Sequence, residues 1–146
     1  MIKIKDERKR AMRHWLMKSE PDCYGWDHLV AKGEDMWEGV RNHSASKNLS
    51  EMQPGDEVLF YHSRQGLEAV GIMEVSSEPF RDPTSGDGKW WTVKVKPKRK
   101  LKQPVTLQQM KADERLKDFV MLRQGRLSVV PVSDAEWAAI LDMAGE

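Results

Sequence analysis

One short segment, residues 37–42, combines residue types that could hold a single nucleobase. Trp37 offers a flat surface for stacking, and Gly39, followed by Val40, lets the backbone approach a ligand closely. Asn42 carries a donor and an acceptor for the edge of a base, and Arg41 can contact phosphate or stack on a base. Taken alone, however, the pattern favours a structural interpretation, with a tryptophan in the core, a glycine turn and an arginine in an ion pair.

Energetics limit what such a pocket can do with a base in a duplex. Extruding the base costs a few kcal/mol, and stacking it on an aromatic side chain returns roughly 1–3 kcal/mol. Because these terms nearly cancel, discrimination must come from hydrogen bonds to the base edge and from the shape of the pocket. We therefore expect one or two aromatic rings, an amide or hydroxyl group, and few charges.

Further candidates for the base pocket lie at the ends of predicted strands. Lys18 and Ser19 end the first strand, where Ser19 could bond a base edge or cap the following helix. Phe60 and His62 share one face of a later strand, although a single histidine in a strand is more often a structural residue than a ligand. Ser128 begins the last strand and completes the predicted pocket.

Positive charge is concentrated in two stretches, although the net charge is only +1. Residues 1–13 carry six basic and two acidic side chains, and residues 94–102 carry six basic side chains and no acidic ones, so the rest of the chain is acidic. Localised positive charge suits phosphate, whereas lysines on an edge strand can also serve only to prevent aggregation. We predict phosphate contacts for five residues: Arg41, Arg123, Arg126, Lys98 and Arg99.

Length and composition exclude several classes of protein. A chain of 146 residues favours one domain, and no apolar run approaches the roughly 20 residues of a membrane span. Cys23 is the only cysteine, which excludes an internal disulfide framework and a thiolate-rich metal site. The charged start of the chain does not resemble a secretory signal. We expect a cytoplasmic monomer, nucleoid-associated if bacterial, with no cofactor, no metal and no membrane partner.

Hydrophobic periodicity predicts an α+β fold, with an antiparallel sheet or small barrel and helices packed around it. Apolar residues at i, i+3 and i+4 (Trp26, Leu29 and Val30) predict a short helix over 24–32, and residues 82–88 read as a flexible connection. Two capping boxes, beginning at Thr106 and Ser133, each start a helix. The predicted strands cover 14–19, 58–62, 69–75, 91–96 and 128–132, and another helix covers 43–52.

Ordered motifs over residues 12–146 resemble those of the EVE-domain family, a branch of the PUA-like superfamily. The resemblance implies a PUA-like twisted antiparallel β-barrel with flanking helices and a pocket, with residues 1–12 as a flexible basic extension and 13–146 as the EVE domain. EVE domains resemble YTH domains, which hold a methylated adenine in an aromatic cage, and are themselves associated with modified cytosine in DNA. The chain departs from the family pattern at His43-Ser44, where the resemblance implies a Tyr-Gln-like pair. The motifs include Trp15-Leu16-Met17-Lys18-Ser19-Glu20-Pro21, Trp37-Glu38-Gly39-Val40-Arg41-Asn42, Gly55-Asp56, Val70-Gly71-Ile72 and Asp82-Pro83-Thr84.

These observations lead to one hypothesis and two alternatives. The hypothesis is a non-catalytic domain that binds nucleic acid, modified DNA in preference to RNA, and holds a modified cytosine between Trp37 and a second aromatic ring while Asn42 and Ser19 read its edge. The first alternative is an RNA-binding PUA-like module. The second is a small amidohydrolase acting on a modified nucleoside, although the available side chains form no recognisable triad or metal spacing. Those side chains are Lys18, Glu20, Cys23, His43 and His62.

Overall fold

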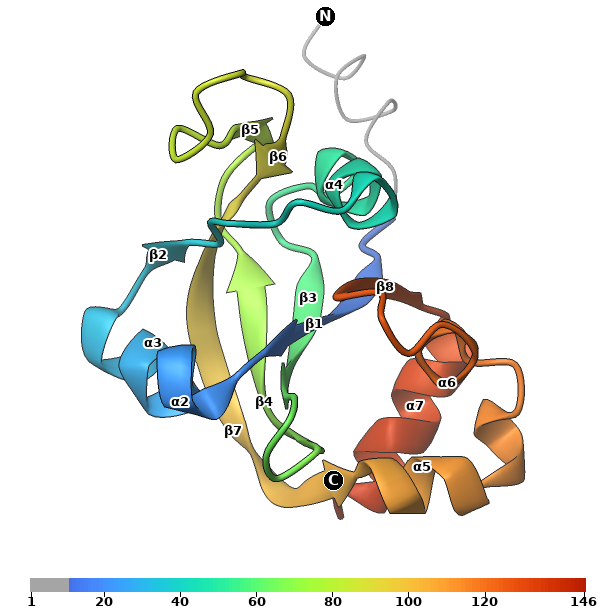
Figure 1. The fold of residues 1–146 in the computed structure, drawn as a ribbon. Helices are drawn as coiled ribbons and strands as arrows, with labels where there is room; N and C mark the ends of the chain where they lie inside the picture. The colour runs from blue at the N-terminus through green and yellow to red at the C-terminus, as the bar shows by residue number, and fades with distance from the viewer. Residues whose placement is uncertain (1–10) are drawn as a thin grey trace, which may run out of the picture.

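A curled six-stranded sheet with helices on both of its faces organises the protein in the computed structural model, which describes residues 11–146 (Figure 1). The strand order is β2-β7-β4-β3-β1-β8, and a separate two-stranded sheet pairs β5 with β6. The predicted extension 1–12 lies outside the described residues except for its last two positions. The elements are β1 (His14–Ser19), α2 (Pro21–Tyr24), α3 (Trp26–Lys32), β2 (Asp35–Met36), α4 (His43–Ser50), β3 (Glu57–His62), β4 (Glu68–Val75), β5 (Phe80–Arg81), β6 (Trp91–Thr92), β7 (Lys94–Thr106), α5 (Leu107–Ala112), η1 (Glu114–Leu116), α6 (Val120–Arg123), β8 (Val129–Val132) and α7 (Asp134–Met143).

The α+β class is confirmed, and one strand pairing differs from the antiparallel arrangement that the sequence predicted. β1 and β3 run parallel, with His14 opposite Glu57 and Ser19 opposite His62. All other pairings within the described sheets are antiparallel. A parallel pair requires a crossover of a dozen or more residues, and the segment containing α2, α3 and α4 supplies it.

The predicted strand 91–96 is wrong in its limits, because the chain changes sheets within it. Thr92 pairs with Phe80 in the small sheet, whereas Lys94 pairs with Met36 in the large one. From Lys94 the chain continues as a single strand to Thr106, although its many lysines and two prolines gave no strand signal. Pairing with the buried strand β4, interrupted by two register shifts, decides the conformation of this segment.

Local sequence signals predicted where helices begin better than which side chains of a helix are buried. Both capping boxes form, with the hydroxyls of Thr106 and Ser133 accepting hydrogen bonds from backbone N–H groups three residues later. The predicted helix 24–32 is instead two helices separated at Gly25. Val30, which was assigned to the apolar face, is 50% exposed, because α3 uses Trp26 and Leu29 to contact the sheet.

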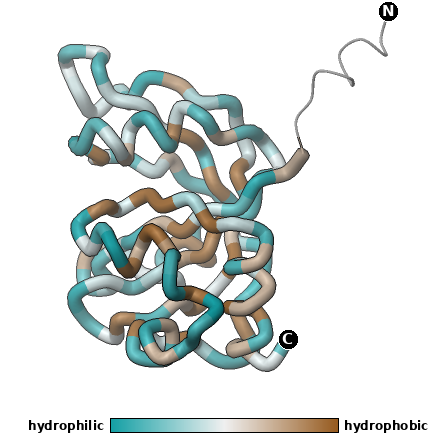
Figure 2. Tube along the Cα trace, turned by 90° about the vertical axis from the view of Figure 1, so that its right-hand side faces the viewer, coloured by the Kyte–Doolittle hydropathy of each residue, from teal (hydrophilic) through white to brown (hydrophobic). Residues whose placement is uncertain are grey.

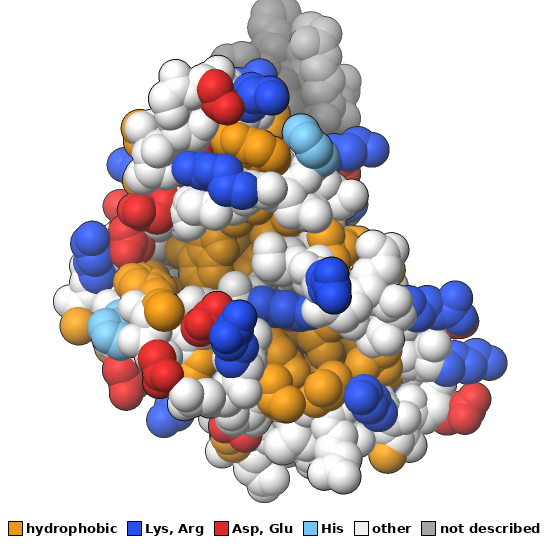
Figure 3. Space-filling view, viewed as in Figure 1, with side chains coloured by type: hydrophobic (Ala, Val, Ile, Leu, Met, Phe, Trp, Pro, Cys, Tyr) orange, Lys and Arg blue, Asp and Glu red, His pale blue; other side chains and the backbone are white. Residues whose placement is uncertain are grey.

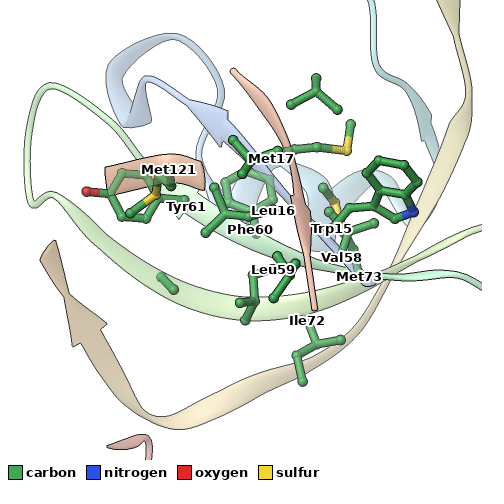
Figure 4. Packing of buried hydrophobic residues seen from close by; sticks show 14 of the residues in the cluster. Trp15, Leu16, Met17, Val58, Leu59, Phe60, Tyr61, Ile72, Met73 and Met121 are labelled. Atoms are coloured by element: carbon green, nitrogen blue, oxygen red, sulfur yellow. The ribbon is translucent and has the colours of Figure 1, made fainter. Parts of the chain in front are cut away.

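The core lies along the central strands and on both faces of the sheet (Figure 4). Hydrophobic residues follow the strands through the interior, whereas the outer loops are mostly hydrophilic (Figure 2). Trp15, in β1, is fully buried and donates its indole N–H to the carboxylate of Asp56 at 3.0 Å. No helix among the described residues is long and apolar enough to cross a membrane.

Gly71 in β4 allows one helix to sit directly on the sheet. The ring of Trp26, the first residue of α3, lies so close that a Cβ added at position 71 would be 2.6 Å from two of its ring carbons. Trp26 then contacts Phe60 edge to face, with ring centroids 5.6 Å apart. The missing side chain of Gly71 therefore fixes the position of α3 and of the segments that follow it.

Candidate functional site

A cavity of about 1020 Å³ opens at one end of the large sheet. It is lined by the end of β1, helix α2, residues 35–41, the turn after β3 and the loop before β8. Figure 3 shows the hollow at the centre of this face, with hydrophobic side chains at its floor and both basic and acidic side chains around it. The side chains that line the opening include five basic and three acidic ones, so the rim has an excess of positive charge: Lys18, Lys32, Arg41, Arg64 and Arg126 against Glu20, Asp35 and Glu38.

The parallel pairing of β1 and β3 explains why distant segments meet at this cavity. The carboxyl ends of parallel strands lie at the same edge of a sheet, so Ser19 and Ser63 become neighbours, with the N–H of Ser63 donating to the carbonyl of Ser19 at 2.9 Å. The antiparallel strand β8 begins at that same edge, and the N–H of Lys18 donates to the carbonyl of Ser128. Three sequence-distant segments thus form one wall.

Residues 37–41 form the opposite wall and are held through their backbone. The N–H of Trp37 donates to the carbonyl of Val93 at 3.0 Å, and the hydroxyl of Thr92 donates to the carbonyl of Trp37 at 2.5 Å. Gly39 has a φ of +88°, a conformation that glycine adopts without strain, and its N–H donates to Asp82 at 2.8 Å. The predicted binding segment is therefore mounted on the β5–β6 hairpin and the start of β7.

Asp82 anchors this wall, and the prediction that residues 82–88 are only a flexible connection was wrong at this position. Its side chain is completely buried and accepts hydrogen bonds from the N–H of Gly39, the guanidinium of Arg41, and both the N–H and the hydroxyl of Thr84. Burial raises the pKa of Asp82, but these bonds outweigh it and lower the pKa to about 2. The carboxylate consequently stays ionised at any physiological pH.

Trp37 is both a core residue and part of the cavity wall, so the two interpretations of its role are not exclusive. It is only 8% exposed. The Tyr24 ring meets it edge to face, with centroids 6.3 Å apart and planes at 86°, and Phe60 meets it from behind at 5.5 Å. Phe60 itself is fully buried and does not line the cavity, which corrects its assignment to the pocket.

Two other predicted pocket residues point their hydrogen-bonding groups at the backbone. The side-chain oxygen of Asn42 accepts from the N–H of Ala45 and caps α4, outside the cavity lining. The Nε2 of His62 accepts from the N–H of Trp26 at 3.2 Å, and burial lowers the pKa of His62. His62 faces a separate, smaller hollow of about 330 Å³. Both side chains supply an acceptor to a backbone N–H group in the first turn of a helix, α4 for Asn42 and α3 for His62.

The polar groups that do line the cavity come from the end of β1 and from β8. The ammonium of Lys18 donates to the carbonyl of Gly125 at 2.8 Å, and burial lowers the pKa of Lys18. The hydroxyl of Ser19 donates to the carbonyl of Tyr24 at 2.5 Å, which leaves its lone pairs able to accept. Ser128 lines the same wall together with Gly125.

The predicted phosphate-contacting residues separate into two groups. Arg41 and Arg126 line the cavity. Arg123, in contrast, pairs with Asp118 at 2.8 Å, Lys98 pairs with Glu57 at 2.6 Å, and Arg99 pairs with Glu146, all away from the cavity. These three cations are already held by carboxylates, so the lysine-rich strand β7 does not contribute to the rim.

The structure also adds lining residues that the sequence analysis did not select. Tyr24 donates its hydroxyl to Asp35 at 2.6 Å, and burial, followed by Asp35, raises the pKa of Tyr24. Burial raises the pKa of Asp35, but its bonds with Tyr24, Met36 and Lys32 lower it overall. Arg64 lines the cavity beside Glu20, 3.4 Å from its carboxylate. Only the parallel pairing places Arg64 here, so no local sequence signal indicated it.

No three His, Cys, Asp or Glu side chains gather into a possible metal site anywhere in residues 11–146. Cys23, an exposed thiol on the cavity wall, is 3.9 Å from the carboxylate of Glu20. That carboxylate is itself paired with Arg64. This part of the wall therefore presents a thiol beside a paired carboxylate and guanidinium.

Comparison with known proteins agrees with this fold. The model of the EVE domain family matches residues 13–143. Human thymocyte nuclear protein 1 is 30% identical over 169 residues, which cover 92% of this chain and 75% of that protein. The solved structure of Rpa0253 from Rhodopseudomonas palustris has a TM-score of 0.87 at 45% identity and covers 92% of this chain and 94% of that one. A crystal structure of the human THYN1 protein, in complex with DNA that contains 5-methylcytosine, has a TM-score of 0.86 at 28% identity and covers 92% and 98% of the two chains.

Proposed function

The chain belongs to the EVE-domain family, and we propose that it is a non-catalytic domain that binds DNA containing a modified cytosine and takes that base, flipped out of the duplex, into the cavity. The human THYN1 protein, similar over nearly the whole chain, has been crystallised with DNA containing 5-methylcytosine. The observation that carries the proposal is the combination, in one cavity, of a tryptophan held through its backbone and a rim on which basic side chains outnumber acidic ones.

The aromatic geometry favours a corner over a sandwich for the bound base. Because the planes of Tyr24 and Trp37 are 86° apart, a base stacked on one ring meets the other ring with its edge. The corner takes the place of the expected arrangement, in which the base lies between Trp37 and a second aromatic ring. A corner leaves one side of the base accessible to the polar wall, and contact with an alkyl substituent on the base adds apolar burial.

Two groups on that wall are suited to the edge of cytosine. The ammonium of Lys18 uses one proton on Gly125 and retains two to donate to the O2 and N3 acceptors of the base. The hydroxyl of Ser19 can accept from the exocyclic amino group while it donates to Tyr24. Lys18 and Ser19 therefore take the discriminating role that the sequence hypothesis gave partly to Asn42.

Arg126 and Arg41 serve as phosphate contacts at the rim. Arg126 is exposed beside the cavity, whereas Arg41 is fixed by Asp82 and retains part of its guanidinium for a ligand. So few contacts predict a shallow dependence of affinity on salt, because each neutralised phosphate contributes about one unit to the slope.

Titration of short duplexes tests the proposal. Duplexes with one central 5-methylcytosine or one cytosine are titrated with wild type, Lys18→Gln and Arg126→Ala. The control is Lys117→Gln, which changes an exposed lysine in the turn between η1 and α6. We expect wild type and Lys117→Gln to prefer the methylated duplex. Lys18→Gln and Arg126→Ala should each weaken both duplexes, Lys18→Gln by about tenfold, and keep that preference, because O2, N3 and the phosphates are the same in the two duplexes. Equal affinity of wild type for the two duplexes would refute the proposal.

Two alternatives are decided by additional arms of the same experiment. An RNA duplex of the same sequence distinguishes a DNA reader from an RNA-binding module, because only contacts with the 2′-hydroxyl separate the two. Incubation with modified nucleosides tests the amidohydrolase alternative, for which Lys18, Glu20 and Cys23 are the available cavity groups. Tighter binding of RNA, or turnover of a nucleoside, would replace the proposed function by the corresponding alternative.

A further inference from the structure

A second aromatic cluster lies beside the cavity, and its two rings are outside the cavity lining. Trp90, at the end of the β5–β6 loop, is half-buried. The ring of His43 lies 4.8 Å from it, centroid to centroid, with planes tilted by 30°, and the guanidinium carbon of Arg41 lies 6.0 Å from its centroid. In Figure 3, hydrophobic, basic and histidine side chains adjoin one another above the hollow, over this hairpin and the start of α4. We call Arg41, His43 and Trp90 the rim cluster.

Trp90 differs from the other tryptophans in what it contacts. Four of them are buried in the core, and Trp91 packs against the core from its edge. Trp90 is neither a member of the core nor packed against it. Burial of apolar area, the ordinary reason for a tryptophan, therefore does not account for Trp90.

The backbone around the rim cluster is firmly held. The carbonyl of Trp90 accepts from the N–H of Asp82 at 2.8 Å, and the N–H of Trp91 donates to Ser46 on α4 at 2.9 Å. His43 begins α4 directly after its cap, Asn42. The three planar groups come from two segments, residues 41–43 and the end of the β5–β6 loop, and hydrogen bonds hold both segments, so their arrangement is fixed before any ligand arrives.

Arg41 connects the rim cluster to the cavity. It lines the cavity, and its guanidinium bonds to Asp82 at 3.2 Å and to Thr84 at 3.0 Å. In the same hairpin, Arg81 stacks closely over Trp91, at 3.9 Å. Arg41 stays 6.0 Å from the Trp90 centroid because Asp82 and Thr84 hold it, so it does not cover the Trp90 ring in the same way.

We propose that the rim cluster stacks on the base that neighbours the captured cytosine on the same strand. The inference rests on the proposed function, since extruding one base from the helix exposes the face of the next. Aromatic rings and guanidinium groups bind any base through its π face, without reading its sequence. The ligand is then a strand of at least two nucleotides, and a free nucleoside fills only part of the site.

Coupling between the cluster and the neighbouring base tests the inference. Methylated and unmethylated duplexes are prepared with the neighbouring nucleotide either intact or abasic, and titrated with wild type and Trp90→Ala. We expect loss of the neighbouring base to weaken wild type about tenfold relative to its effect on Trp90→Ala, which no longer distinguishes the intact from the abasic duplex. If the two losses simply multiply, the rim cluster does not contact that base and the inference is wrong.

Three further variants separate stacking from other causes. Trp90→Phe keeps an aromatic ring and should keep the coupling. His43→Ala, an exposed change, should reduce the coupling, so the test still holds if Trp90→Ala lowers the melting temperature. Arg81→Ala removes a cation from the same hairpin and should retain the full wild-type coupling. Loss of coupling in Arg81→Ala, or its persistence in both His43→Ala and Trp90→Ala, contradicts the assignment.

The same titrations distinguish failure of this inference from failure of the proposed function. The preference for methylated over unmethylated duplex reports on the cavity and should survive in Trp90→Ala. If wild type lacks this preference but the coupling is present, the proposed function fails and the stacking assignment stands. If wild type binds none of the duplexes, both are refuted.

Discussion

Asp82 offers a quantitative test of how the cavity wall is held. Asp82→Asn removes the charge that receives Arg41 and replaces one of the two accepting oxygens by a donor, with almost no change in volume. The pKa of the buried carboxyl is about 2, against an ordinary value of 3.8. Because one pKa unit corresponds to 1.36 kcal/mol, ionised Asp82 contributes about 2 kcal/mol to the free energy of unfolding. We expect Asp82→Asn to lose about that amount in urea denaturation at pH 7.

The sign of the pH dependence follows from the lowered pKa. The contribution is fully present above pH 4, where the unfolded carboxyl is also ionised, and is lost as the pH falls from about 4 to 2. The difference in unfolding free energy between wild type and Asp82→Asn should therefore shrink by about half at pH 3. Asp87→Asn, an exposed change in the same loop, should stay within about 0.5 kcal/mol of wild type. A difference that is absent at pH 7, or equally large at pH 3, would refute this account of the wall.

Two further predictions concern the packing of α3. Gly71→Ala places a methyl group 2.6 Å from the Trp26 ring and should cost about 1–3 kcal/mol of unfolding free energy in thermal or urea unfolding. The control, Gly86→Ala, has nothing within 4 Å of the added carbon and should be nearly neutral in the same experiment. Equal stability of the two variants would contradict the packing argument. Burial lowers the pKa of His62, and its neutral ring accepts a hydrogen bond from the N–H of Trp26. The contribution of His62 to the free energy of unfolding should therefore be complete above pH 6.5 and fall below it, and His62→Gln should flatten that part of the pH profile. An unchanged profile in the variant would show that His62 does not carry the effect.

Local signals in the sequence predicted most of the elements. Hydrophobic patterning indicated the inner strands, and the capping boxes at Thr106 and Ser133 placed the starts of two helices. Val30 was misassigned because a pattern at i+4 does not say which residues of a short helix reach the sheet. The part of β7 after Lys96 was missed because pairing with β4 outweighs the low strand propensity of lysine and proline.

The candidate site was harder to predict because its parts meet through tertiary pairing. The segment 37–42 stood out by composition, and most of it does line the cavity. Its support, Asp82, lies in a loop whose composition reads as flexible, and only burial shows that the carboxylate is an anchor. Arg64 reaches the cavity through the parallel pairing of β1 and β3, which no periodicity reveals. Asn42 and His62 accept hydrogen bonds from the backbone N–H groups of Ala45 and Trp26, which residue type alone cannot indicate.

The central claim is that a modified cytosine leaves the duplex and enters the cavity, and the energy of extrusion tests it most directly. The affinity of wild type is measured for a duplex with 5-methylcytosine opposite guanine and for one with 5-methylcytosine opposite an abasic site. Unpairing costs less in the second duplex, so a protein that flips the base should bind it about tenfold or more tightly, and Lys18→Gln should bind it more weakly than wild type. Equal affinity of wild type for the two duplexes would mean that the base stays in the helix and would contradict the account.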